Sequence, residues 1–253
     1  MNSIPKIIHY CWFGVQPLPE LAIECITSWR KYFPDYIIKE WNESNYDVHK
    51  TQYTSEAYIA KKYAFVSDYA RFDVLYQYGG IYFDTDVEVI KSFDDVLKNG
   101  GFMGLESQGF VATGLGMGCN ARLDVIYQIV NLYANIHFAN KDGSYNLKTV
   151  VEYATEVLKK NGLRNENSIQ FLNGLVIYPV DYFDPKNYIT GITTITTNTH
   201  SIHHYDGSWL SPHMKKLLQE KAFVGRTVKN KGIAYLLNKL CTVKKIIFEK
   251  IYP

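Results

Sequence analysis

The sequence predicts an α/β fold in which helices pack on a central, mainly parallel sheet. Residues 6–13 (KIIHYCWF) are a continuous apolar run that ends at Gly14, which is typical of a strand buried on both faces. An amphipathic helix pattern follows at 20–32, and a second strand-like run (YIIKEW) occupies 36–41. Strand, helix and strand in this order begin a parallel α/β unit.

The stretch 63–90 (YAFVSDYARFDVLYQYGGIYFDTDVEVI) contains the most informative pattern in the chain. Its apolar residues recur at spacings of three and four, which predicts a helix. Two glycines at 79–80 end this helix, because glycine readily adopts the left-handed conformation of a C-cap. A short apolar strand, 81–83, follows the glycines, and an acidic triplet at 84–86 comes directly after it.

The patterns in the second half of the chain are weaker but continue the alternation of strands and helices. We expect a strand and a short helix over 87–96, strands with a mobile loop in the glycine-rich segment 100–119, helices at 122–134 and 147–160, a strand at 176–179 followed by a turn, and a strand or hairpin in the threonine-rich segment 190–199. Together these elements predict one domain over 1–213 and a separate tail over 214–253.

The composition indicates a globular chain that can bury a large core. Of 253 residues, 47% are hydrophobic and 21% are charged. The four cysteines form no CxxC pair and no zinc-binding spacing, so we expect reduced thiols in a cytoplasmic protein. The start, MNSIPKIIHYCWFG, lacks the apolar run of a signal peptide, and no segment reaches the roughly 20 apolar residues of a membrane-spanning helix.

The tail, 214–253, is strongly basic, with ten Lys or Arg against two Glu. Apolar residues alternate with these charges, which predicts an amphipathic helical segment that can lie on an anionic membrane surface. The alternative is a helix packed on the domain with a solvated basic face. We expect the membrane contact, which would place the protein at the inner face of the cytoplasmic membrane. We expect no nucleic-acid partner, because no nucleic-acid-binding motif accompanies the charge.

Asp84 and Asp86 are the candidate cation ligands. Two carboxylates two residues apart at the end of a strand can converge on one divalent cation, and Mg²⁺ and Mn²⁺ prefer oxygen ligands. The alternative is a turn with solvated acids, since Asp-x-Asp is a common pattern. Upstream, Asp68 and Arg71 are three residues apart on the expected helix, so they share a face and can pair. Their position among aromatic residues, just before the acid pair, favours a role in the same site.

These motifs resemble glycosyltransferase family 32, the sugar transferases that contain a DXD motif. The resemblance rests on the segments SDYARFDVLYQYGGIYFDTDV, IPKIIHYCWFG, PDYIIKEWNESN and HHYDGSW. The family includes bacterial capsular and cell-wall polysaccharide transferases and the yeast initiating mannosyltransferases. A more distant similarity is to the glucosyltransferase domain of the clostridial toxins. The resemblance implies a GT-A fold with one Rossmann-like nucleotide-binding domain, a nucleotide-sugar donor, Mn²⁺ or Mg²⁺, and retention of anomeric configuration.

The resemblance also implies roles for individual residues at the start of the chain. Trp12 would stack on the nucleotide base, with Cys11 and Phe13 beside it. Asp68 and Arg71 would hold the donor sugar and ribose region and contribute to catalysis.

The remaining implied roles fall around the acid pair and near the C-terminal end. Tyr82 would pack near the nucleotide, and Asp84, Thr85 and Asp86 would form the DXD motif, with Asp86 the more direct metal ligand. Ser208 and Trp209 would close onto the diphosphate. A related retaining family uses a histidine as third metal ligand in a similar sequence context, which His204 fits best and His203 second. Only one of these neighbours can face the metal if they lie on a strand.

The expected reaction is transfer of a hexose or N-acetylhexosamine from a nucleotide sugar, with UDP as the favoured nucleotide. The expected acceptor is a growing bacterial surface glycan such as capsule, O-antigen or a lipid-linked oligosaccharide. The alternative is an effector or toxin that glycosylates a protein. For the stereochemistry we favour same-face attack by the acceptor, which needs no enzyme nucleophile. A double displacement would need a carboxylate against the anomeric carbon, and the sequence identifies none.

Overall fold

The computed structural model describes residues 3–107, 109–188, 190–207 and 216 of the chain. It contains two compact units, one formed by Met1–Pro185 with Ile195–His204 and the other by Lys186–Thr194 with Tyr205–Pro253. The sheet, the helices and the site described below belong to the first unit.

Three sequence predictions concern residues that the structure does not describe. The basic tail, 214–253, lies outside the described residues except for Lys216. The two expected diphosphate contacts, Ser208 and Trp209, also lie outside them. Within the parts of the chain that are described, no helix is both long and apolar enough to cross a membrane.

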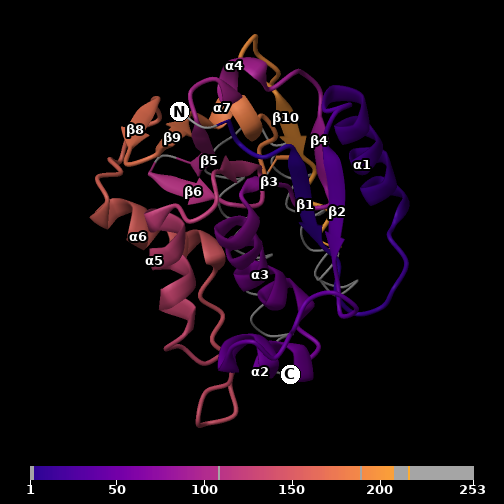
Figure 1. Ribbon diagram of the computed structural model, residues 1–253, viewed down its shortest axis with the longest axis vertical. Coiled ribbons are helices and arrows are strands. Elements are labelled where there is room, and N and C mark those ends of the chain that lie inside the picture. The colour runs from indigo at the N-terminus through magenta and orange to yellow at the C-terminus, as the bar shows by residue number, and fades with distance from the viewer. Residues whose placement is uncertain (1–2, 108, 189, 208–215, 217–253) are drawn as a thin grey trace, which may run out of the picture. The chain divides into compact units, whose positions relative to one another are not determined.

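The first unit contains strands and helices along its whole length (Figure 1). The first half contains β1 (Ile7–Cys11), α1 (Glu20–Tyr32), β2 (Ile37–Trp41), α2 (Gln52–Ile59), α3 (Tyr63–Tyr78), β3 (Gly80–Tyr82), β4 (Val87–Val89) and α4 (Asp94–Leu97). The second half contains β5 (Gly101–Ser107), β6 (Phe110–Ala112), β7 (Met117–Cys119), α5 (Asp124–Tyr133), α6 (Val150–Lys160), β8 (Gln170–Leu172), β9 (Leu175–Tyr178), α7 (Val180–Phe183) and β10 (Ser201–His203).

Among the described residues, eight strands form one sheet in the order β2-β1-β3-β7-β5-β9-β8, with β6 paired to β5. The pairs of β1 with β2 and β3, and of β5 with β9, are parallel. β7 runs antiparallel to both β3 and β5, and the pairs β5-β6 and β8-β9 are also antiparallel. The predicted α/β fold is therefore confirmed, but its sheet is mixed. Parallel ladders occur in β2-β1-β3 and β5-β9.

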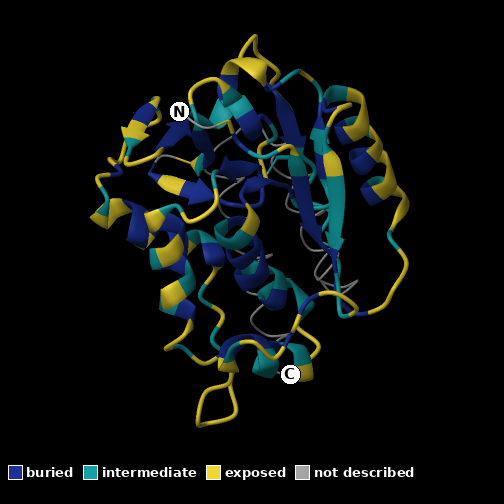
Figure 2. Ribbon diagram, in the orientation of Figure 1, coloured by how far each residue is buried: buried dark blue, intermediate teal, exposed yellow. Residues whose placement is uncertain are grey.

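The sheet is buried on both faces, which explains why its central strands are continuously apolar in sequence. Successive residues of a strand point to opposite faces. In β1, Ile8 and Tyr10 join the core formed with α1, whereas Cys11 joins the core formed with α2, α3, α5 and α6. In the same way Tyr82 of β3 faces α3, and its neighbour Ile81 faces α1. Figure 2 shows these central strands in the colour of buried residues.

The junction between α3 and β3 is fixed by glycine and by one buried histidine. Gly79 ends α3 at φ 65°, and Gly80 has φ 102° with its Cα so close to β1 that a Cβ would lie 2.6 Å from the Ile7 carbonyl oxygen. His9 accepts a hydrogen bond from the Trp41 indole at 3.0 Å, and its Nε2 donates to the Gly79 carbonyl at 2.8 Å. Burial lowers the pKa of His9 to about 4, which keeps the ring neutral. The end of α3 is thus tied to β1, and α3 delivers the chain directly into β3.

Two weaker sequence predictions differ from the structure. The segment after β9 forms the short helix α7, although we predicted a turn there. We predicted a strand or hairpin in the threonine-rich segment 190–199, and its described residues form only an isolated antiparallel bridge between Lys186 and Thr193. The Thr196 hydroxyl forms side-chain hydrogen bonds instead, donating to Asp181 at 3.1 Å and accepting from the Asn198 amide at 3.1 Å. Such side-chain bonds compete with a strand ladder.

Candidate donor-sugar and metal site

The site lies at the carboxyl end of the central strand β3, where residues of α3 and of the turn after β3 meet. Asp84 follows β3 directly, and its backbone amide donates to the Gly114 carbonyl at 3.1 Å. A turn then carries the chain to β4, with the Val87 amide donating to the Asp84 carbonyl at 3.1 Å. Asp68 and Arg71 project from α3 toward the same place, so the helix and the acid pair predicted from sequence meet in space.

Arg71 links the two predicted halves of the site. Its Nη2 donates to Asp68 Oδ1 at 2.9 Å and lies 3.4 Å from Asp84 Oδ1. Its Nη1 lies 3.4 Å from both Asp84 Oδ2 and Thr113 Oγ1, and its guanidinium carbon lies 5.0 Å from the centroid of the Tyr82 ring. The Arg71 side chain is only 6% exposed. One buried guanidinium therefore balances two carboxylates, and its rigid fork fixes both of them.

Asp84 is held by contacts from three residues, and its side chain stays 27% exposed. Tyr82 donates its hydroxyl to Asp84 Oδ1 at 2.9 Å, and Arg71 donates to both oxygens. The opposite wall is Gly114, at which a Cβ would lie 1.9 Å from Asp84 Oδ2. Only a glycine leaves room for this carboxylate. Neither Gly114 nor Thr113 was predicted as a site residue, because nothing in the sequence of the glycine-rich segment indicates that it packs against the acid pair.

Asp68 is a buried carboxyl whose charge the fold opposes. Its side chain is 13% exposed. Burial raises the pKa of Asp68 to about 7, Arg71 acts against this rise, and Asp84 adds to it. Asp68 can therefore gain or lose a proton near neutral pH. A bound sugar hydroxyl or phosphate would compete with Asp68 for hydrogen bonds from Arg71.

The raised pKa of Asp68 predicts a pH-dependent stability. An unfolded Asp has a pKa of about 3.9, so between about pH 4 and pH 7 the folded state binds the proton more tightly and stability falls as pH rises. We expect the unfolding free energy of wild type to fall by up to about 1.4 kcal/mol for each pH unit between pH 4 and pH 7. Asp68→Asn has no proton to lose at this position, so its unfolding free energy should lack this fall. Urea titrations of both proteins at several pH values measure this difference. Parallel pH profiles would contradict it.

Asp86 lies beside the two histidines near the C-terminal end of the first unit. β10 pairs antiparallel with β4, and this register sets His203 opposite Val87. His203 Nε2 lies 3.1 Å from Asp86 Oδ1, whereas His204 Nε2 lies 2.9 Å from Glu88 Oε2. The His204 backbone amide donates to the Asp86 carbonyl at 2.9 Å. The structure thus brings His203, our second choice, to the DXD acid, and directs the ring of His204 to Glu88.

The charge of Asp86 acts on His203. Burial lowers the pKa of His203, but the Asp86 carboxylate outweighs this and raises it above the ordinary value. A cation on Asp86 would oppose a positive charge on His203, so metal binding at Asp86 and protonation of His203 compete.

The donor atoms present fit a magnesium or manganese ion. Asp84 and Asp86 supply carboxylate oxygens, which these hard cations prefer. Within the described residues no three His, Cys, Asp or Glu side chains are grouped closely enough to hold an ion by themselves. Mg²⁺ is commonly bound by one or two carboxylates together with substrate phosphates, so a complete protein cage is not required.

The expected base-binding segment at the end of β1 is only partly accessible. Cys11 and Phe13 are buried, at 7% and 6% exposure, and burial raises the pKa of the Cys11 thiol to about 12. Trp12 is half-buried, and its indole donates to the Gln16 carbonyl at 2.6 Å. Of the three, Trp12 alone offers an aromatic surface to a ligand. Thr85 is also half-buried, in the turn between the two acids.

The comparison with known families concerns the same part of the chain. Residues 19–102 match the family described as glycosyltransferase sugar-binding region containing DXD motif. These residues make up about a third of the chain, and they are similar to the sugar-binding region of the DXD-containing glycosyltransferases. This region contains Asp68, Arg71, Asp84 and Asp86, and the match confirms the resemblance on which their predicted roles rest.

Several known proteins are similar to this chain. The chain is 29% identical over 147 residues to inositol phosphoceramide mannosyltransferase 3 of Schizosaccharomyces pombe, covering 54% of this chain and 40% of that protein. It is 30% identical over 114 residues to inositol phosphoceramide mannosyltransferase 1 of the same organism, covering 34% of that protein. The chain therefore spans well under half the length of these two relatives. An uncharacterized glycosyltransferase of Acanthamoeba polyphaga mimivirus is 26% identical and is matched over 86% of its length and 84% of this chain.

Among solved structures, the PaToxG glycosyltransferase is similar over part of the chain. The similarity has a TM-score of 0.48 at 20% sequence identity, over 63% of this chain and 69% of that one.

Proposed function

We propose that this protein is a metal-dependent glycosyltransferase that takes a hexose from a nucleotide-sugar donor. The observation behind the proposal is the Asp68-Arg71-Asp84 arrangement, in which a helix and a strand end of the DXD region hold two partly buried carboxylates on one buried guanidinium. Desolvating several charges is unfavourable, so stability alone does not account for this arrangement, and a role in binding a ligand does. A GT-A fold agrees with the mixed α/β sheet.

Each side chain has a specific task in the proposed reaction. Asp84 and Asp86 would hold Mn²⁺ or Mg²⁺, and His203 lies near enough to Asp86 to influence it. When bound, such an ion neutralises charge on the departing diphosphate. Arg71 is a permanently charged donor that can contact diphosphate or sugar oxygens once these displace part of its bonding to Asp84. Asp68 can accept or donate a hydrogen bond to a sugar hydroxyl, depending on its protonation.

For the stereochemistry we propose retention by same-face attack of the acceptor. The site needs no carboxylate nucleophile for this route, since a phosphate oxygen of the leaving group can take the acceptor proton. Its catalytic contribution is then the positioning of the donor and the stabilisation of the leaving diphosphate.

The names of two relatives bear on the donor and the acceptor. Both are called inositol phosphoceramide mannosyltransferases, so mannose is the first hexose to test and a lipid-linked glycan is a candidate acceptor. UDP sugars remain the donors expected from the sequence resemblance. A bacterial surface glycan as acceptor, and contact of the basic tail with an anionic membrane, also remain proposals.

A donor screen tests the proposed function. The full chain is incubated with UDP-glucose, UDP-galactose, UDP-N-acetylglucosamine and GDP-mannose, and release of the nucleoside diphosphate is measured with Mn²⁺, with Mg²⁺ and with a chelator. We expect release from at least one donor that stops when the chelator is added and resumes with excess Mn²⁺. The proposal is wrong if every donor stays intact, or if turnover proceeds at the same rate without a divalent ion.

A further inference from the structure

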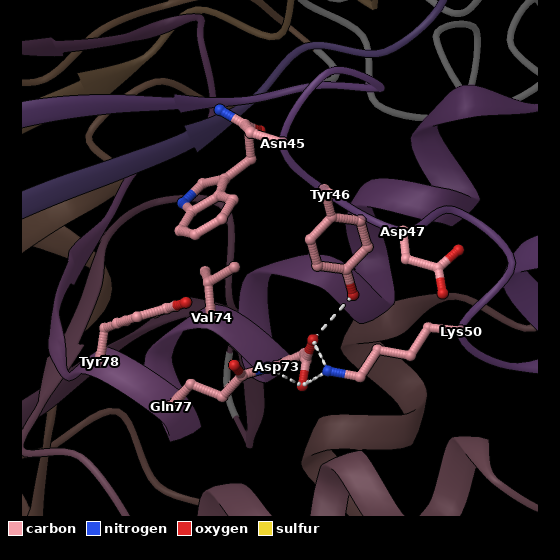
Figure 3. Close-up of a pocket in the computed structure, with 9 residues that line it drawn as sticks. Asn45, Tyr46, Asp47, Lys50, Asp73, Val74, Gln77 and Tyr78 are labelled. Carbon is pink, nitrogen blue, oxygen red and sulfur yellow. Dashed lines mark hydrogen bonds and ion pairs between the residues drawn. The ribbon is translucent and has the colours of Figure 1, made fainter.

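Asp73 is a buried carboxylate of α3 that takes no part in the DXD site. It is 3% exposed. Its Oδ2 accepts from the Tyr46 hydroxyl at 3.0 Å and from Lys50 Nζ at 2.6 Å, and its Oδ1 accepts from Lys50 Nζ at 2.8 Å and from Gln77 at 2.8 Å (Figure 3). Four hydrogen bonds to one buried carboxylate hold their donors firmly, because charge-assisted bonds are short and strong in a protein interior.

These bonds cross a hollow between α3 and the loop 42–50 that follows β2. The hollow has a volume of about 220 Å³, and residues 45–47 and Lys50 of the loop line it together with residues of α3. Figure 3 shows Tyr46 and Lys50 reaching from the loop to Asp73 on the helix. Tyr46 and Val48 of the loop are buried in the core that α3 shares, and the contacts of Asp73 with Tyr46 and Lys50 add a polar connection between the loop and α3 across the hollow.

The other side of the loop holds the expected base-binding segment. The ring of Tyr46 packs on Phe13 with 5.9 Å between centroids. Glu43 accepts from the Gly14 backbone amide at 2.7 Å and from the Tyr58 hydroxyl at 3.1 Å. Gly14 has φ 99°, so the chain turns sharply directly after the aromatic pair Trp12-Phe13. The loop therefore contacts this segment at Phe13, through a ring contact, and at Gly14, through a hydrogen bond.

We infer that Asp73 is a positioning residue for the nucleoside of the donor, acting through the loop 42–50 on the segment 11–14. The inference rests on the proposed function for the identity of the ligand. In this arrangement Asp73 fixes Tyr46, Tyr46 fixes Phe13, and the fixed backbone presents Trp12 to the base. A pre-positioned aromatic surface lowers the entropy lost on binding, so the contribution appears in donor affinity.

The contacts from Asp73 to the segment 11–14 predict that variants change KM for the donor but not kcat. Asp73→Asn keeps the shape of the side chain but removes the charge that holds Lys50, and Tyr46→Ala removes the ring that packs on Phe13. We expect either change to raise KM for the donor about 10-fold while kcat stays within about twofold. The lost contact binds the nucleoside equally in the ground state and the transition state, and the residues around the bond that breaks are unchanged. Tyr46→Phe keeps the ring, so its effect on KM is smaller than that of Tyr46→Ala.

A matched control separates positioning from general stability. Gln170 is another buried polar residue, 1% exposed, that bonds to the backbone of Arg164 and Glu166. It lies on β8, at the opposite edge of the sheet from β2. Gln170→Met loses its hydrogen bonds but has no contact with the loop 42–50, so we expect a lower melting temperature with an unchanged donor KM.

A second readout does not depend on turnover. Amide hydrogen exchange of the wild-type chain and of Asp73→Asn reports how firmly Trp12, Phe13 and Gly14 are held. The inference predicts faster exchange at these amides in Asp73→Asn and unchanged exchange there in Gln170→Met. Unchanged exchange in Asp73→Asn, or a donor KM equal to that of wild type, overturns it. A wild-type chain that uses no nucleotide sugar would instead overturn the proposed function, and the exchange experiment would still decide whether Asp73 holds the segment.

Discussion

Replacing Arg71 with methionine is expected to lower the free energy of unfolding by about 3–5 kcal/mol, the usual result of removing one partner from a buried ion pair. The variant leaves Asp68 and Asp84 without their shared cation in a site where Asp68 is 13% and Asp84 27% exposed. Urea denaturation near pH 7.5 measures the loss. The variant should also lose activity, because both carboxylates are released from their positions.

Two further variants show whether charge causes this loss. Arg30→Met changes an exposed arginine in the last turn of α1 and should alter stability by no more than about 0.5 kcal/mol. Adding Asp84→Asn to Arg71→Met removes a carboxylate that has lost its guanidinium partner and should recover part of the lost stability. If Arg71→Met is as stable as wild type, the two carboxylates do not depend on this guanidinium and our account of the site fails.

Gly114→Ala is expected to reduce turnover about 100-fold, the effect of displacing a catalytic group by about 1 Å. The new methyl group would lie 1.9 Å from Asp84 Oδ2 and 2.8 Å from its Cγ, so the carboxylate must move away from the position set by Tyr82 and Arg71. The backbone of Gly114 does not have a positive φ, so alanine itself is not strained there. The measurement is steady-state turnover of the preferred donor at saturating Mn²⁺.

Gly143→Ala serves as the opposite control. Gly143 has φ 83°, which strains alanine, but no heavy atom lies within 4 Å of its Cβ position. We expect Gly143→Ala to lose stability, by about 1–3 kcal/mol, and to keep its turnover. Full activity in Gly114→Ala would show that the position of Asp84 does not matter for the reaction.

Much of the fold was predictable because strong local patterns coincide with the elements. Helix α1 has the bounds predicted from its amphipathic pattern, and α3 ends at Gly79 as its glycine pair indicates. The direction of the strands in the glycine-rich segment was not predictable. Residues 101–119 form three strands with antiparallel partners, and pairing direction depends on contacts between strands rather than on the local sequence.

The candidate site was predictable only where it lies within one continuous motif. Asp68, Arg71 and Asp84 meet because a helix and the strand after it are joined by a tight glycine turn. Contacts from distant segments have no local signal. The choice between His203 and His204 depends on the register of β10 against β4, and a shift of one residue would exchange the two side chains. Asp73 likewise resembles a surface acid in sequence, and only the approach of the loop 42–50 reveals that it is buried.

The central claim is that Asp84 and Asp86 hold a divalent cation together with the donor diphosphate. The most direct measurement is turnover of the preferred donor as a function of Mn²⁺ concentration in wild type, Asp84→Asn, Asp86→Asn and Asp94→Asn, in which the last changes an exposed acid on α4. We predict that either DXD variant loses about 100-fold or more in turnover and responds weakly to Mn²⁺, since a bound metal supplies several kcal/mol of charge stabilisation, whereas Asp94→Asn behaves as wild type. Wild-type turnover and an unchanged Mn²⁺ response in folded Asp84→Asn and Asp86→Asn would contradict the claim.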